Sequence, residues 1–103
     1  MTGDIESIHT FDRLIHEPAR LAIMAVLSVV ESADFAYLLN ATKLSKGNLS
    51  AQLSKLQESG YVSIIKDLKG NYPHTNCSLT GKGRKAFKAY RKQYLALAKQ
   101  FGG

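Results

Sequence analysis

The segment 41–62, ATKLSKGNLSAQLSKLQESGYV, constrains the fold of this chain more than any other stretch. Its apolar residues recur with the helical period and form one stripe, which consists of Leu44, Leu49, Leu53 and Leu56. Ser45 stands before the stripe as an N-cap, and Gly60 follows it as a left-handed stop. Leu44 and Leu49 are spaced to form a hydrophobic staple across the cap. The pattern predicts a helix at 45–59, buried along one side and preceded by a short turn.

The other faces of this predicted helix carry groups that hydrogen-bond to base edges and phosphates. Asn48 and Gln52 have amides suited to adenine, and the ammonium group of Lys46 suits guanine. Gly47 and Ala51 are small enough to let the helix backbone approach the floor of a groove. Phosphate contacts suit the remaining polar candidates, which are Ser45, Ser50 and Lys55. An ordinary surface helix is polar too, so the neighbouring elements must decide between the two interpretations.

Those elements predict a single α+β domain over 1–103, mainly α with a small β-hairpin, in the order α-α-α-α-β-β-α. The helices are expected at about 4–15, 18–30, 35–41, 45–59 and 81–101, and the strands at 61–66 and 75–79. Asp4 would cap the first helix, whose apolar residues are Ile5, Ile8, Leu14 and Ile15. Pro18 suits the first position of the second helix. Pro73 is expected to limit regular strand pairing nearby.

A basic turn, KDLKGNYPH at 66–74, joins the two predicted strands. Its candidate DNA-binding residues are Lys66, Lys69, Asn71, Tyr72 and His74. Lys69 could enter a minor groove or hold a phosphate. Asp67 would oppose a phosphate, and a solvated loop with ordinary charges is the alternative. A short helix, a turn, a capped helix and then a basic hairpin are together typical of a winged helix-turn-helix.

Charge is distributed unevenly along the chain. Residues 1–40 hold two basic and six acidic residues, a net charge of −4, whereas residues 41–103 hold twelve basic and two acidic residues, a net charge of +10. The excess of positive charge therefore begins where the proposed reading helix begins. This asymmetry favours a polyanionic partner, although overall charge alone would also serve solubility.

The last predicted helix carries an apolar seam at spacings of 3, 4, 3 and 4, which is a heptad-type pattern. The seam either packs on its own domain or joins a second subunit together with the first helix. The second interpretation predicts a dimer interface formed by Ile5, Ile8, Phe87, Tyr90, Tyr94, Leu97 and Phe101. A homodimer would place two reading helices one duplex turn apart, roughly 34 Å, on a palindromic site.

Several classes of function lack support in the sequence. His9, His16 and His74 lie far apart, and the single cysteine, Cys77, permits neither a disulfide within the chain nor a cysteine-rich zinc module, so no metal or cofactor is expected. Cys77 is expected in the core, since a redox sensor needs an exposed, low-pKa thiolate. No set of acid, base and nucleophile indicates an enzyme, so no catalytic residue is proposed. The chain shows no signal peptide, and the apolar run 21–30 is too short for a membrane span, which predicts a cytoplasmic protein.

The segment 34–62, DFAYLLNATKLSKGNLSAQLSKLQESGYV, resembles the helix-turn-helix of the winged-helix transcriptional regulators of the MarR/ArsR-like group. It is most similar to their compact branch, the winged-helix DNA-binding domain family of archaea and bacteria. LTGKGRKAF at 79–87 resembles that branch's junction between wing and last helix. The resemblance covers about 11–101. It implies a helix-turn-helix at 34–59, a wing at 61–79 with its tip at 66–74, a dimerisation helix at 81–101, and a homodimer.

Two features of the chain depart from the pattern of that group. Metal-sensing members carry paired cysteines at the third helix, and residues 32–39 have none. Larger MarR-type members build a ligand pocket from longer terminal helices, for which 103 residues leave little room, so an effector is not indicated.

The sequence therefore predicts a dimeric regulator that binds double-stranded DNA specifically and represses by occupying a promoter. Two alternatives stay open, a winged helix that binds another protein and a sequence-tolerant architectural or RNA-binding domain driven by the basic last helix. The operator and the sign of regulation are not encoded in any motif.

Overall fold

The computed structural model describes residues 7–102. In chain order its elements are the 3-10 helix η1 (Ser7–Thr10), α2 (Pro18–Ser28), β1 (Ala33–Asp34), α3 (Phe35–Thr42), α4 (Lys46–Glu58), β2 (Val62–Lys69), β3 (Tyr72–Leu79) and α5 (Gly81–Gln100). The α+β class and the winged-helix arrangement predicted from the sequence are confirmed.

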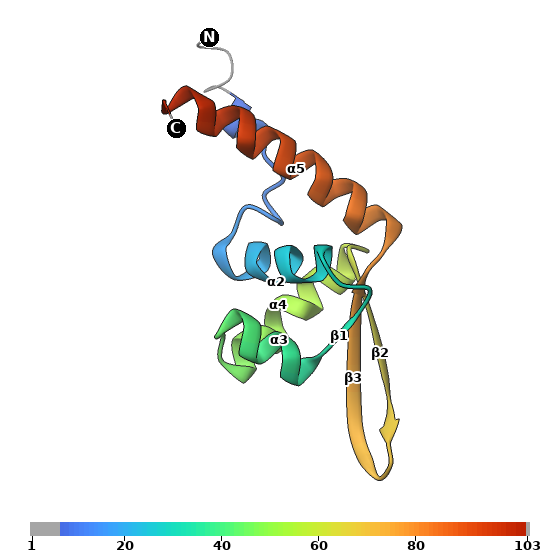
Figure 1. Ribbon diagram of the computed structural model, residues 1–103. Helices are drawn as coiled ribbons and strands as arrows, with labels where there is room; N and C mark the ends of the chain where they lie inside the picture. The colour runs from blue at the N-terminus through green and yellow to red at the C-terminus, as the bar shows by residue number, and fades with distance from the viewer. Residues whose placement is uncertain (1–6, 103) are drawn as a thin grey trace.

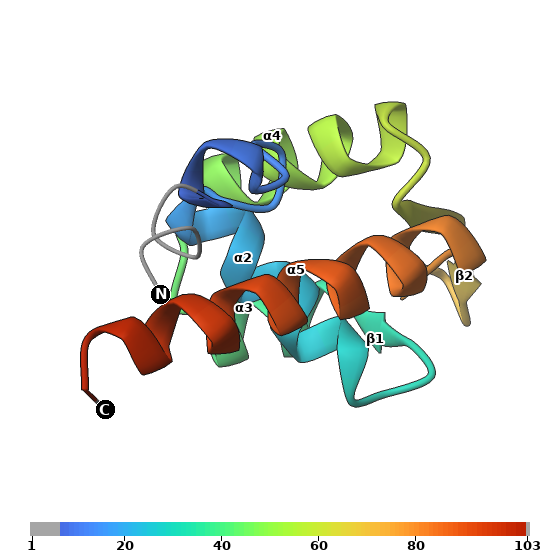
Figure 2. The same cartoon turned by 90° about the horizontal axis from the view of Figure 1, so that it is seen from above.

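The helices form a layered body from which the hairpin projects (Figure 1). The helix α5 crosses one end above α2, α3 and α4 lie below α2, and β2 and β3 extend past them in the opposite direction from α5. Seen from above, α2 lies between α4 and α5 (Figure 2), and it packs against both. We call the hairpin formed by β2 and β3 the wing. With extents of 57 × 25 × 21 Å, the molecule is elongated by the wing and by α5.

The helix boundaries follow the capping residues that the sequence offers. Asp34, Ser45 and Thr80 accept backbone N–H groups from the first turns of α3, α4 and α5, at 2.7, 3.1 and 2.9 Å. Gly60 ends α4 with φ +83°, in the left-handed region. Its N–H donates to the carbonyl of Gln57, and the N–H of Tyr61 donates to that of Leu56, which is a Schellman motif.

The expected first helix at 4–15 is wrong over the residues that the structure describes. Only Ser7–Thr10 is helical, as a single 3-10 turn, and two buried side chains, Phe11 and Ile15, anchor the segment that follows. The Asp12 carboxylate accepts the N–H of Leu14 at 2.9 Å. This local side-chain bond favours a turn over a continuing helix. Asp4, the proposed cap, lies outside the described residues.

Within residues 7–102 the sheet has three strands in the order β1-β3-β2, all antiparallel, whereas the sequence predicted two strands. The additional strand β1 is two residues long and pairs with Cys77 and Asn76 of β3. The wing strands are longer than predicted, and Pro73 lies inside β3 opposite Leu68, contrary to the expectation that it would limit pairing. Because β1 does not reach Pro73, β3 is an edge strand at that point. The N–H that Pro73 lacks on the open edge therefore removes no hydrogen bond between strands.

The start of α5 is joined to the end of α4. The N–H of Thr80 donates to the carbonyl of Tyr61 at 3.1 Å, and the Lys82 ammonium donates to the carbonyl of Ser59 at 2.8 Å. The same ammonium lies 5.6 Å from the centre of the Tyr61 ring. These contacts hold the long terminal helix in a fixed position relative to α4.

Candidate nucleic-acid interface

One side of α4 is anchored in the core and the other is open. Leu49, Leu53 and Leu56 are buried, as the sequence predicted, and they pack in the core around α2. The exposed side presents most of the predicted reading residues, which are Ser45, Lys46, Gly47, Asn48, Ser50, Ala51 and Lys55. Glu58 is also exposed, but it is the last residue of the helix. Within the described chain, the outer flank of residues 46–55 is therefore accessible.

Gln52 is the exception among the predicted reading residues because it is half-buried. The Nη1 atom of Arg20 donates to Gln52 Oε1 at 2.7 Å, and Gln52 Nε2 donates to Asn48 Oδ1 at 2.9 Å. A side chain at the start of α2 is thus linked through Gln52 to the exposed face of α4. Sequence reasoning missed Arg20, because no local pattern shows that it reaches a residue 32 positions later.

The beginning of α4 suits close approach by an anion or a groove. Ser45 accepts the N–H of Asn48 in the first turn, and the helix dipole at this end favours negative charge. Gly47 lies in open space, since a Cβ added there would meet no other atom within 4 Å. The glycine is therefore not required by the packing of the described chain itself.

The turn before α4 supplies a cation that the sequence analysis did not single out. Lys43 caps α3 in the left-handed conformation, with φ +60°, and is exposed. Its ammonium group donates to Asn40 Oδ1 at 3.2 Å, beside the entry to α4. The available signal was a basic residue two positions before the N-cap Ser45.

The wing presents different groups on its two faces. Strand alternation places Lys66 on the same face as the core residue Val62 and the half-buried Ile64, which packs against the core. That face looks onto α4 across a groove lined by Phe35, Ser50, Leu53, Ser54, Gln57, Ile64, Lys66 and Thr75. The groove brings Lys66 and Ser50, predicted separately, to one surface.

The tip of the wing is exposed, and Gly70 in its two-residue loop has φ +66°, as a tight hairpin turn requires. Lys69, Asn71 and Tyr72 are exposed there. His74 is placed differently, with its ring nitrogens 3.3 Å from Asp67 Oδ1 and 3.6 Å from Asp34 Oδ2. Two carboxylates thus hold His74 against the start of α3, which sets it apart from the other predicted wing contacts.

The apolar seam of α5 divides into an inner and an outer set. Tyr90 and Leu97 are only 2% and 7% exposed and belong to the core, so we withdraw both from the predicted dimer interface. The Tyr90 hydroxyl lies 2.7 Å from His16 Nδ1, and its ring packs edge-on against Phe11 at 5.4 Å between centroids. Packing within the protomer therefore accounts for some of the large aromatic side chains in the seam.

The outer set remains accessible. Tyr94 is 50% exposed, Phe101 is 74% exposed, and Ile8 is also exposed, whereas Phe87 is half-buried. Leu95, which the heptad pattern omitted, is exposed beside Tyr94 and lines an apolar groove with it and Leu21. Ile5 lies outside the described residues.

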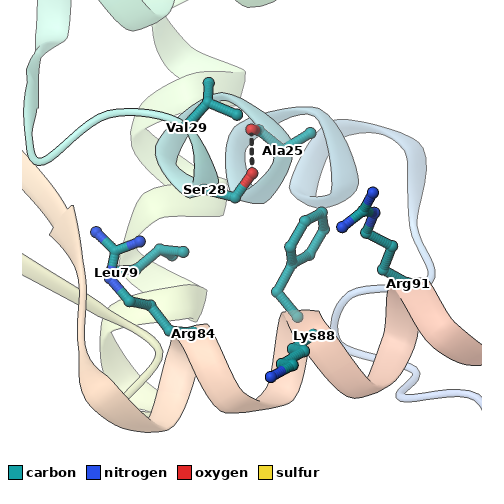
Figure 3. Close-up of a pocket in the computed structure, with 8 residues that line it drawn as sticks. Ala25, Ser28, Val29, Leu79, Arg84, Lys88 and Arg91 are labelled. Carbon is teal, nitrogen blue, oxygen red and sulfur yellow. Dashed lines mark hydrogen bonds between the residues drawn. The ribbon is translucent and has the colours of Figure 1, made fainter.

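A second hollow lies between α2 and the first half of α5 (Figure 3). The α2 side contributes Ala25, Ser28 and Val29, and the α5 side contributes Phe87 and three cations, Arg84, Lys88 and Arg91. The guanidinium of Arg84 donates to the carbonyl of Val30 at 3.3 Å. The basic residues of α5 therefore border a hollow that lies away from the wing tip. None of the described residues that line this hollow is acidic.

Two buried side chains, Cys77 and Tyr90, have raised pKa values. Burial, with the negative charge of Asp34 nearby, raises the pKa of the buried Cys77 thiol to about 11, which opposes a thiolate at neutral pH. Burial also raises the pKa of Tyr90, with a smaller effect from Tyr94. Among residues 7–102, no three His, Cys, Asp or Glu side chains come together as metal ligands, and no helix is both long and apolar enough to cross a membrane.

Comparison with known proteins places this arrangement in context. A family model described as a winged helix DNA-binding domain matches residues 19–99. An uncharacterised protein of Methanocaldococcus jannaschii is 36% identical over 87 residues, which cover 84% of this chain and 95% of that protein. Residues 19–99, which the family model matches, contain α4, the wing and nearly all of α5.

Solved structures show the same fold at lower sequence identity. A transcriptional regulator homologue from Pyrococcus horikoshii superposes with a TM-score of 0.85 and 23% identity, covering 96% of this chain and 97% of that one. A MarR-family transcriptional regulator from Silicibacter pomeroyi superposes with a TM-score of 0.68 and 21% identity, covering 94% of this chain and 61% of that one. The arrangement of helices and wing is therefore shared with proteins both of this length and longer.

Proposed function

The chain belongs to the winged-helix DNA-binding domain family, and from that premise we propose that it is a sequence-specific transcriptional regulator that places α4 in the major groove of duplex DNA. One observation carries the proposal: the leucines of α4 are buried while the polar side chains of Lys46, Asn48 and Lys55 are exposed. A helix anchored in this way can enter a groove about 12 Å wide without unfolding any part of the core. The compact winged-helix branch suggested by the sequence motifs agrees with the family match.

The roles of the α4 residues follow from their exposure and chemistry. Asn48 and Lys46 are the proposed base readers, because both side chains are exposed and carry hydrogen-bond donors. Gly47 and Ala51 form the low surface that lets the backbone approach the bases. Phosphate contacts are assigned to the exposed polar groups at the margins, Lys43, Ser45, Ser50 and Lys55.

The wing is proposed to contact DNA beside the major-groove site. Lys66 faces the groove next to α4 and is suited to a phosphate, whereas Lys69, Asn71 and Tyr72 at the tip extend furthest from the body. His74 is not assigned a DNA contact, because Asp34 and Asp67 already hold its ring.

We also propose a homodimer built on the outer surface of α5. The groove lined by Leu21, Phe87, Tyr94 and Leu95 would be covered by the same surface of a second copy, with Phe101 and Ile8 at its margin. A twofold axis of this kind lets two copies of α4 meet successive major grooves, roughly 34 Å apart. Binding of this kind at a promoter would exclude polymerase, so we propose repression as the outcome.

Competition and salt dependence test the proposed function. Duplexes enriched from a random pool are measured by fluorescence anisotropy against a shuffled duplex over a range of salt concentrations. A specific regulator retains at least about a thousandfold preference for the enriched duplex. A sequence-tolerant architectural protein shows a steep salt slope without preference, and a protein-binding module shows neither, so either result overturns the proposal.

Two substitutions divide base reading from phosphate binding in the same assay. Asn48→Ala should relax discrimination at one or two base pairs by about 1–3 kcal/mol. Lys55→Ala should weaken enriched and shuffled duplexes alike and reduce the salt slope by about one. Lys92→Ala, which removes an exposed charge from α5, is the matched control and should leave the discrimination unchanged.

A further inference from the structure

We propose that Arg20, which lies outside α4, sets the base preference of α4 by fixing the orientation of the Gln52 and Asn48 side-chain amides. The inference rests on the proposed function and deepens it, since it concerns which base edges the reading helix accepts. We call the chain of hydrogen bonds from Arg20 through Gln52 to Asn48 the amide relay.

Arg20 is held firmly enough to act as the origin of the relay. Its side chain is 13% exposed, and its Nε atom donates to the carbonyl of Leu14 at 2.6 Å. Its backbone N–H donates to the Glu17 carboxylate at 2.9 Å, and that carboxylate lies 3.9 Å from Nη1. Nη1 is therefore fixed beside Gln52 by contacts that do not involve α4.

The chemistry of the guanidinium determines the direction of every later bond. Arginine only donates hydrogen bonds, so Gln52 must turn its oxygen toward Arg20. The Gln52 nitrogen then faces Asn48, and because that nitrogen also only donates, Asn48 must turn its oxygen toward Gln52. Flipping either amide would bring two N–H donors together, so only one orientation satisfies both contacts.

This orientation determines what α4 offers to DNA. Both amide oxygens already accept a hydrogen bond within the protein, at 2.7 and 2.9 Å. Among the described residues, Asn48 Nδ2 donates to no protein acceptor, and Asn48 is exposed. The outward group of the relay is therefore an N–H donor.

A donor surface favours bases that present acceptors in the major groove. Guanine offers two neighbouring acceptors, N7 and O6, and thymine offers O4, whereas the single adenine acceptor, N7, stands beside the N6 donor, which opposes a second N–H of the amide. The adenine contact expected from the sequence requires an amide oxygen to accept from N6, and here that N6 group would have to share an oxygen that is already engaged. We therefore infer that Asn48 selects guanine or thymine, and that Arg20 acts as a positioning residue for this choice.

The test compares duplexes enriched from one random pool by the wild-type chain and by variants of the relay. The wild-type chain should enrich guanine or thymine at the position that loses discrimination in Asn48→Ala. Arg20→Met removes the donor, which frees the Gln52 and Asn48 amides to turn, so the preference over adenine should fall by about tenfold, the size of one base-edge contact. Arg20→Lys retains a donor and should keep the wild-type preference.

A second variant reverses the relay without removing Arg20. In Gln52→Glu the carboxylate accepts from Arg20 with one oxygen and from Asn48 Nδ2 with the other, which turns Asn48 Oδ1 outward. The preference at that position should then move to cytosine or adenine, whose N4 and N6 groups donate. A purely structural role for Arg20 would change affinity or stability but would not exchange one base for another. Arg13→Met, the loss of an exposed arginine from the segment before α2, is the control and should enrich the wild-type site.

The outcomes separate the relay from the function on which it rests. If the wild-type chain enriches a site and Arg20→Met and Gln52→Glu enrich the same one, the relay is wrong and the regulator proposal stands. If the wild-type chain enriches no site, the proposed function fails and the relay fails with it. Exchange of guanine or thymine for adenine or cytosine in Gln52→Glu supports the relay even where Arg20→Met folds poorly.

Discussion

Gly83 marks a contact between α5 and Tyr61, the residue before β2, that only a hydrogen atom can fill. A Cβ at this position would lie 2.1 Å from the carbonyl oxygen of Tyr61 and 2.9 Å from its carbonyl carbon. We expect Gly83→Ala to lower the free energy of unfolding by about 1–3 kcal/mol, because the backbone of one element must shift to relieve the overlap. Urea denaturation followed by circular dichroism measures the change.

Gly81, two residues earlier in α5, provides the control because a Cβ there meets nothing within 4 Å. Gly81→Ala should leave stability unchanged or raise it by up to about 1 kcal/mol. Equal effects of the two substitutions would show that the contact with Tyr61 is looser than described.

Tyr61 connects the end of α4 to the segment before α2, since its hydroxyl donates to Asp12. Burial, the hydrogen bond to Asp12 and the charge of Asp12 raise the pKa of Tyr61 from 10.0 to about 12. The folded state therefore retains the phenolic proton more tightly than the unfolded state. The associated stability is present below pH 10 and is lost as the pH rises from 10 to about 12. The wild-type urea midpoint should fall more between pH 9 and pH 11.5 than that of Tyr61→Phe, and parallel curves would contradict this account.

Individual residues were predictable where their role is local. The caps Ser45 and Thr80 act on N–H groups three residues away, and Gly60 ends α4 within one turn. The contacts of Arg20 and His74 were not predictable from the sequence, because their partners lie far along the chain or on another strand. Nothing in the local pattern shows that both the oxygen and the nitrogen of the Gln52 amide are hydrogen-bonded within the protein.

At the scale of elements, α4 combines a buried stripe with an unusually open first turn. Gly47 costs helix stability and fills no space in the described protein, which is consistent with close approach by DNA. We expect Gly47→Ala to raise the free energy of unfolding by up to about 1 kcal/mol while weakening binding to the enriched duplex. Denaturation and anisotropy on the same sample measure both effects, and tighter binding would place the DNA backbone or bases away from this turn.

The elements themselves were predictable to the extent that periodicity and caps determine them. The helices α3, α4 and α5 were predicted to within two residues, because each begins at a capping side chain. The strand β1 was missed since two residues, Ala33 and Asp34, carry no alternation. The first helix was overextended because Ile8 and Ile15 fit a helical stripe, whereas the Asp12 side chain competes for the backbone locally.

At the scale of the whole molecule, the outer surface of α5 is the proposed meeting point of two copies. Tyr94 is half exposed at its centre, so Tyr94→Asp would place a charge in an apolar contact and should shift the protein to monomer in sedimentation. Leu68→Asp is the control, since Leu68 is 70% exposed on the wing and should leave the association state unchanged. Circular dichroism verifies that both variants are folded. A dimer that persists in Tyr94→Asp would place the interface on another surface.

The seam of α5 shows why assembly is hard to infer from a sequence. Its heptad spacing fits both packing within the protomer and packing against a partner. Burial divides the seam, with Tyr90 and Leu97 inside and Tyr94 and Phe101 outside. The elements that lie against α5, among them α2, η1 and the segment between them that holds Phe11, separate the two sets.

Titration of an enriched duplex into the ¹⁵N-labelled chain is the most direct test that α4 is the reading element. The account predicts that backbone signals of the exposed positions among residues 46–55 shift most, followed by those of the wing tip, while those of the buried Leu49, Leu53 and Leu56 move little. Shifts confined to the basic helix α5, with residues 46–55 unaffected, would contradict it.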